Sequence, residues 1–279
     1  MTARQFTVSA FSDDWRGGNP AAVCILDEWL DDDTLQAIAA QNNLSEPAFI
    51  HRGDLGAASK LAHSLRLRWF TPSHEVDLCG HATLATAHIL YQHCGVASDA
   101  VLSFKTRSGT LKSTLEDANI VLDFPACWPK PVDSISRVWF ALGPIEPLGV
   151  WAGDDYLVVY DSAQTVRGLS PEFAKLKELD RRGVIATALS EDARDDFLSR
   201  FFAPKLAVDE DPVTGSAHCQ LFPFWSERLS KTRLSGWQAS SRGGRVEGEV
   251  LADRVVLKGQ ATTFSTGQLV APLGTVEAR

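Results

Sequence analysis

Two short segments, far apart in the chain, share one pattern: an acidic residue in a turn, a glycine, and then an apolar helical stretch that contains alanine. The first is DLCGHATL at residues 77–84, and the second is DPVTGSAH at residues 211–218. The unpaired N–H groups and the dipole of a helix N-terminus attract anions. Two such helix starts, one from each half of the chain, predict a cleft suited to a small anionic ligand. We therefore expect an enzyme that acts on a carboxylate.

Both helical stretches are apolar on nearly every side, the first over residues 82–91 and the second after Gly215. A helix that is hydrophobic all round is buried. Pro223 is expected to kink the second helix or to end its regular hydrogen bonding.

Strand-like segments surround these two stretches. Leu65, Leu67 and Trp69 alternate with arginines, as in a half-buried strand. Further strands are predicted at residues 120–124, 156–160 and 184–188, with a hairpin formed by residues 246–251 and 255–257.

Two further helices are predicted from their starts. Asp33 is expected to cap one that contains Leu35, Ile38 and Ala39, and Ser170-Pro171 to begin another that reaches about Leu179.

The pattern as a whole predicts an α+β fold of two similar halves. The boundary is placed at residues 116–119, just before the strand at 120–124. One half then comprises residues 1–118, joined by the C-terminal residues 265–279, and the other comprises residues 119–264.

Composition limits the kinds of molecule that the protein is expected to bind. The formal charge is −8, from 27 basic and 35 acidic residues, and no run of lysine or arginine forms a stripe that could follow phosphates. We expect no nucleic-acid partner. The N-terminus alternates like a strand and lacks the apolar run of a signal peptide, and no segment approaches the length of a membrane span. A soluble cytoplasmic protein is expected.

Metal and cofactor signatures are missing from the sequence. The five cysteines contain no Cys-x-x-Cys pair, which disfavours a disulfide framework or a zinc site. There is no phosphate loop or dinucleotide fingerprint, and no Gly-x-Ser-x-Gly elbow of a hydrolase. We expect no cofactor and no metal.

Glu46 is the strongest candidate for a general acid/base. It is a lone carboxylate between apolar neighbours, and partial burial there would favour a proton shuttle. The competing interpretation is an exposed carboxylate in the turn before Pro47.

Four segments together carry a resemblance to a known family. They are GNPAAV at residues 18–23, NLSEPAF at 43–49, LRWFTP with the following VDLCGHATL at 67–84, and DEDPVTGSAH at 209–218. In this order and spacing, the chain resembles the phenazine-biosynthesis isomerase family, which is related in fold to diaminopimelate epimerase. The resemblance implies two halves, each a curved mixed β-sheet or barrel around a central helix, with the active site between them. It also implies a homodimer.

The same resemblance assigns roles to individual residues. It implies that Glu46 is the catalytic acid/base and that His81 contacts the substrate, although a lone histidine at a helix start often caps or packs. It also implies that Asp211 hydrogen-bonds the substrate, where helix capping is the competing role. The other residues expected to bind substrate are Ser45, Gly80, Thr214, Gly215 and Ser216, with Asn19 and Arg242 as further possible contacts.

Cys79 leaves an alternative open. In the related epimerases, one cysteine before each central helix moves the α-proton from one face of the substrate. Here Cys79 holds the first place, but the second motif has no cysteine in its turn. A two-thiol racemase is therefore disfavoured, while the role of Cys79 itself stays open.

The primary hypothesis is a cofactor-independent isomerase of this family. It would shift a proton within a small amino or hydroxy carboxylic acid, with Glu46 as both base and acid. The alternatives are an epimerase or racemase that uses Cys79 and Glu46, and a catalytically silent ligand-binding or interaction protein on the same fold.

Overall fold

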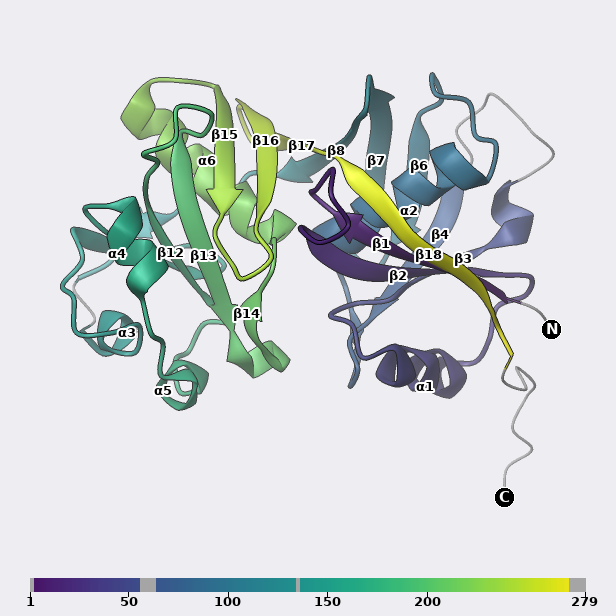
Figure 1. Ribbon diagram of the computed structural model, residues 1–279, viewed down its shortest axis with the longest axis horizontal. Helices are drawn as coiled ribbons and strands as arrows, with labels where there is room; N and C mark the ends of the chain where they lie inside the picture. Colours follow the sequence, from purple (N-terminus) through teal and green to yellow (C-terminus); the bar gives the residue numbers. More distant parts are fainter. Residues whose placement is uncertain (1–2, 56–63, 134–135, 271–279) are drawn as a thin grey trace. The chain divides into compact units, whose positions relative to one another are not determined.

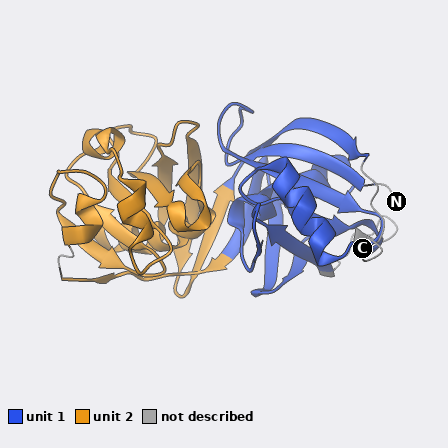
Figure 2. Cartoon of the chain, turned by 90° about the horizontal axis from the view of Figure 1, so that it is seen from below, with its two compact units in different colours: residues 1–123, 259–279 blue, residues 124–258 orange. Residues whose placement is uncertain are grey.

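The computed structural model describes residues 3–55, 64–133 and 136–270, and the chain divides into two compact units (Figure 2). The first unit comprises residues 1–123 and 259–279, and the second comprises residues 124–258. Each unit has its own hydrophobic core. None of the helices among the described residues is long and apolar enough to cross a membrane.

The first unit is a curved mixed sheet packed on one buried helix (Figure 1). In order of pairing, its strands are β18 (Ala261–Leu269), β1 (Ala3–Ala10), β2 (Asn19–Leu26), β3 (Ala48–His51), β4 (Ser64–Phe70), β6 (Leu102–Thr106), β7 (Gly109–Glu116) and β8 (Asn119–Pro125), with β5 (Glu75–Val76) also paired to β4. Helix α2 (Gly80–His93) packs against β1, β2 and β18. Helix α1 (Asp32–Asn42) and the 3-10 turn η1 (Arg52–Leu55) complete the unit.

The second unit repeats this design. Its strands are, in order of pairing, β9 (Lys130–Pro131), β10 (Gly149–Ala152), β11 (Tyr156–Val159), β12 (Val184–Leu189), β13 (Phe197–Ala203), β15 (Arg233–Gln238), β16 (Gly244–Leu251) and β17 (Arg254–Gly259), with β14 (Val208–Asp211) also paired to β13. Its buried helix is α6 (Gly215–Leu229), which packs against β15 and β16. The shorter helices are α3 (Ser136–Phe140), α4 (Ala163–Gly168), α5 (Phe173–Lys177) and the 3-10 turn η2 (Pro204–Leu206).

The two units have the same connectivity. The parallel pairs described are β2–β3 and β4–β6 in the first unit, and β11–β12 and β13–β15 in the second. A parallel pair needs a long crossover, which is usually helical. In each unit the buried helix is the crossover of the second parallel pair, α2 in one and α6 in the other. The expected α+β fold of two similar halves is confirmed, and within each unit the described strands pair as an open row rather than a closed barrel.

The division of the structure differs in detail from the boundary placed on the sequence. Residues 116–119 form the turn between β7 and β8, and the first unit extends to Asp123 because β8 pairs with β7. The chain returns to the first unit at Gly259, earlier than residue 265, because β18 pairs with β1 along its length. Residues 271–279, also assigned to that half from sequence, lie outside the described residues.

The predicted strands and the predicted hairpin are all present, but two helix starts were wrong. Asp31, not Asp33, caps α1, since its carboxylate accepts from the N–H of Thr34 at 2.8 Å. The helix expected to begin at Ser170-Pro171 and to reach Leu179 is only α5, which begins after Glu172.

Pro223 neither ends nor shortens α6, which continues to Leu229. Proline lacks an N–H group, so the carbonyl of Cys219 loses its usual partner one turn away. The backbone N–H of Cys127 donates to that carbonyl at 2.9 Å instead. The effect of Pro223 is thus a substituted hydrogen bond, provided by a neighbouring segment of the same unit.

Candidate functional site

Glu46 lies between the end of α1 and the start of β3. Helix α1 ends at Asn42, and its C-cap residue Asn43 adopts the left-handed conformation with φ of 51°. The carbonyl of Pro47 then accepts from the N–H of Phe70, which fixes the segment against β4. The side chain of Glu46 is 18% exposed. The carboxylate is therefore partly buried, rather than on a fully exposed turn.

Cys79 and His81 lie at the N-terminus of α2. Cys79 is the N-cap residue, with extended backbone and no capping hydrogen bond from its side chain. The hydroxyl and the N–H of Thr83 both donate to the carbonyl of Cys79, at 2.5 and 3.2 Å, which holds this turn in place. Gly80 is the first helical residue, and no acidic residue occupies the first turn. The start of α2 thus keeps the anion-attracting character expected from the sequence.

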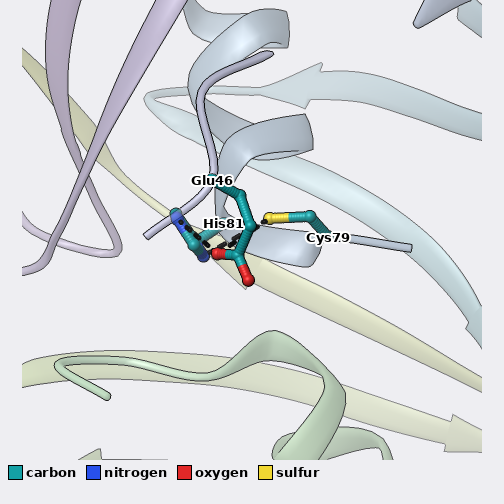
Figure 3. A group of neighbouring side chains, drawn as sticks. All are labelled: Glu46, Cys79 and His81. Carbon is teal, nitrogen blue, oxygen red and sulfur yellow. Dashed lines mark hydrogen bonds and ion pairs between the residues drawn. The ribbon is translucent and has the colours of Figure 1, made fainter. Parts of the chain in front are cut away.

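These segments bring three side chains into one cluster, Glu46, Cys79 and His81 (Figure 3). The Sγ atom of Cys79 lies 3.7 Å from Oε2 of Glu46 and 3.5 Å from Nδ1 of His81. Nε2 of His81 lies 3.6 Å from the same Oε2. Cys79 and His81 are buried, at 6% and 4% exposed, so solvent reaches the cluster mainly through Glu46.

His81 is electrically neutral at physiological pH. Burial lowers its pKa to about 3, because the charged imidazolium cannot be solvated there. Its Nε2 atom is buried and has no hydrogen-bond partner within the described parts of the chain. A buried polar atom of this kind is rare and calls for an explanation, and a bound ligand would supply one.

Four candidates in the second unit surround the start of α6. Asp211 ends β14, and its carboxylate accepts from the hydroxyl of Thr214 at 2.5 Å. Thr214 is the N-cap residue of α6, and Gly215 and Ser216 form its first turn. Asp211 and Thr214 are 8% and 7% exposed. Asp211 thus fixes the N-cap residue of α6.

Gln238 is a residue of this region that sequence reasoning missed. It is fully buried on β15, and its amide accepts from the N–H of Thr214 at 2.9 Å and donates to the carbonyl of Asp211 at 2.7 Å. It closes the turn between β14 and α6. A glutamine in an alternating strand carries no motif, so only the fold reveals its role.

Arg182 and Asp155 were also missed. Asp155 is 1% exposed and binds Arg182 through two hydrogen bonds of 2.9 and 2.7 Å, and Nη2 of Arg182 also donates to Oγ of Ser216 at 2.9 Å. The guanidinium is therefore held in place beside the first turn of α6. In the sequence, Arg181 and Arg182 look like a solvated pair of charges.

The three remaining candidate residues lie in separate segments of the chain. Ser45 adjoins Glu46 and is partly buried. Asn19 is fully buried at the start of β2, where it pairs with Ala10 on β1. Arg242 is partly buried in the turn between β15 and β16, and its N–H donates to the hydroxyl of Ser240 at 3.3 Å.

Comparison with known proteins identifies the family of this chain and several proteins that are similar to it. The chain matches the family model described as phenazine biosynthesis-like protein over residues 8–267. An uncharacterized isomerase of Pseudomonas aeruginosa is 51% identical over 264 residues, which cover 95% of this chain and 97% of that protein. A crystal structure of a PhzF-family phenazine biosynthesis protein from Enterococcus faecalis matches with a TM-score of 0.89 and 42% identity, covering 96% of this chain and 99% of that one. A hydroxyproline epimerase from Agrobacterium vitis shares the fold, with a TM-score of 0.58 at 12% identity and coverage of 98% and 94%.

Proposed function

The chain belongs to the phenazine biosynthesis-like protein family, and from this premise we propose that it is a cofactor-independent isomerase that shifts a proton within a small carboxylic acid. The relatives that are named isomerases support the class of reaction. The observation that carries the proposal is the position of Glu46, a partly buried carboxylate beside the N-terminus of a buried helix. The substrate class is an amino or hydroxy acid.

Glu46 would act as both base and acid. One carboxylate that removes a proton from one carbon and returns it to another needs no second catalytic acid. His81 is neutral, so it lies beside Glu46, with Nε2 3.6 Å from Oε2, without pairing with it as a cation. The N–H groups in the first turn of α2, at Gly80 and His81, would stabilise the negative charge that develops on the substrate.

The proposed substrate contacts of the second unit have a different task. Asp211, Thr214, Gly215 and Ser216 would hydrogen-bond the polar substituents of the substrate, and Arg182 would keep Ser216 in position. In this proposal, Glu46 transfers the proton and the residues of the second unit bind the substrate. The two roles can be tested by separate substitutions.

The contact between Cys79 and Glu46 favours one base over two. In a two-base epimerase, the acid and the base lie on opposite sides of the reacting carbon, each within a hydrogen-bond reach of about 3 Å. Their separation would then be roughly 6 Å, whereas Sγ of Cys79 lies 3.7 Å from Oε2 of Glu46. This direct contact supports a mechanism with one base.

Cys79→Ser is therefore expected to retain most of the turnover. The substitution keeps a small hydrogen-bonding side chain at the N-cap while removing the thiol. The measurement is the steady-state rate compared with Cys94→Ser, which changes the cysteine at the other end of α2. A loss as large as that of Glu46→Gln would instead support the epimerase that uses Cys79 and Glu46.

Asp211→Asn is expected to weaken substrate binding more than turnover. The asparagine can still accept from Thr214, so the start of α6 should keep its geometry while the negative charge is lost. Calorimetric affinity and the catalytic rate are compared with Asp209→Asn, an exposed aspartate on the same strand. Unchanged affinity in Asp211→Asn would remove this residue from the binding site.

The proposed function itself is tested by a screen of amino and hydroxy acids in heavy water. Deuterium that appears at a new carbon supports isomerisation, and deuterium at the same carbon with inverted configuration supports epimerisation. If no acid in the screen exchanges carbon-bound hydrogen, the silent binding protein becomes the better interpretation.

A further inference from the structure

We propose that Glu46, Cys79 and His81 form a zinc-binding site. The three residue types are the nitrogen, sulfur and oxygen ligands that zinc prefers in proteins. Three protein ligands leave a fourth position open to water or to an anion. No sequence motif indicates such a site, because Cys79-x-His81 matches no zinc motif and Glu46 is brought in only by the fold.

The distances are close to those of a metal site. Zinc lies about 2.0–2.3 Å from its ligand atoms, so in a tetrahedral site these atoms are roughly 3.3–3.7 Å apart. With Nε2 of His81 as the ligand, Oε2 of Glu46 lies 3.6 Å from this nitrogen and 3.7 Å from Sγ of Cys79, and the ligand atoms of the three residues lie within 4.8 Å of one another. A zinc ion could enter once Sγ and Nε2 move toward each other, while Nδ1 stays beside Sγ.

Burial separates this cluster from an ordinary group of surface carboxylates. Cys79 and His81 are almost completely buried, and Nε2 of His81 has no hydrogen-bond partner in residues 3–55, 64–133 and 136–270. A metal bond at this atom would satisfy it. The partial exposure of Glu46, at 18%, provides a route for the ion from solvent.

The charges of the zinc ion and of its proposed ligands also balance. The N-terminus of α2 carries a partial positive charge, which disfavours a bare cation. With the thiolate of Cys79 and the carboxylate of Glu46 as ligands, however, the two negative charges cancel the charge of the zinc ion. The bound site is then neutral in total, and the helix dipole opposes it little.

Zinc at this position would inhibit the enzyme rather than serve it. The metal would occupy the carboxylate proposed to move the proton, so zinc and substrate should compete. This consequence rests on the proposed function, whereas the binding of zinc does not.

The binding test uses the complete protein without substrate. Zinc affinity and stoichiometry are measured at neutral pH by competition with a chromophoric chelator, and cobalt is used as a spectroscopic substitute. We expect one equivalent bound, and a thiolate-to-cobalt charge-transfer absorption. Cys79→Ser, His81→Gln and Glu46→Gln should each lower the affinity by more than the roughly 10–100-fold typical for loss of an outer-shell partner.

Cys94→Ser is the matched control, because it removes a partly buried cysteine from the other end of the same helix. It should bind zinc like the parent, and circular dichroism should show that every variant is folded. Parental affinity in Cys79→Ser or His81→Gln, or a cobalt complex without the thiolate band, would overturn the proposal. An equal loss in Cys94→Ser would also overturn it.

Inhibition is measured separately, once an exchanging substrate is known. Zinc that binds with one equivalent but does not inhibit would leave the metal site standing and contradict the role of Glu46. Zinc that inhibits without the thiolate band of the cobalt complex would place the metal elsewhere and refute the site proposed here.

Discussion

Glu46→Gln is expected to lower turnover by about 10²–10⁴-fold, the usual contribution of general acid–base catalysis. Glutamine keeps the shape of glutamate and can still hydrogen-bond, but it cannot accept and return the proton. Substrate affinity should change little, because the proposed binding groups are elsewhere. The variant should also stay folded, since the substitution leaves no cavity at this partly buried position.

The measurement combines single-turnover exchange in heavy water with calorimetric affinity. Glu28→Gln is the matched control, because Glu28 is exposed in the loop before α1 and makes no contact with the cluster among the described interactions. It should behave like the parent. Near-parental exchange by Glu46→Gln would show that another group moves the proton, and the central assignment would be wrong.

Acidification is expected to destabilise the fold strongly between about pH 6.5 and 4. Burial lowers the pKa of His81 to about 3 and that of His218 to about 4, from an ordinary value of 6.5. Below pH 6.5 the unfolded chain binds protons at these positions that the native state does not bind. Unfolding therefore becomes more favourable as the pH falls, and above pH 6.5 these two residues make stability almost independent of pH.

The expected slope is about 1.4 kcal/mol per pH unit for each histidine, so from pH 6.5 to 5 the pair costs on the order of 4 kcal/mol. Urea unfolding across this range measures it. His218→Gln should remove about half of the slope attributed to the pair, whatever its effect at pH 7. A parental slope in His218→Gln would contradict the assignment.

Much of the local structure could be predicted because it depends on short-range patterns. The alternation around Leu67 marked β4, and the apolar residues after Gly80 and Gly215 marked the two buried helices. The predicted helix starts were wrong where more than one nearby residue suited the same role. Asp31 and Asp33 are equally good caps by residue type, and only the backbone path decided that Asp31 accepts from Thr34.

The candidate site was predicted residue by residue, not as an arrangement. Glu46 and His81 were singled out separately, but their contact with Cys79 depends on the segment before β3 meeting the start of α2. Arg182 and Gln238 were not predicted from the sequence, because their roles depend on partners on other strands and helices, which no local pattern encodes.

By itself, the sequence determined the fold class and the starts of the two buried helices, α2 and α6, because hydrophobic period and turn chemistry act over a few residues. The assignment of Glu46 as acid/base came from the family resemblance and stays a prediction. The tertiary structure decided what depends on desolvation and on distant partners. Burial makes His81 neutral, and the N–H of Cys127 lets α6 continue through Pro223. Both effects arise because strand pairing brings segments together that are far apart in the chain, and the free energy of a polar group depends on what surrounds it there.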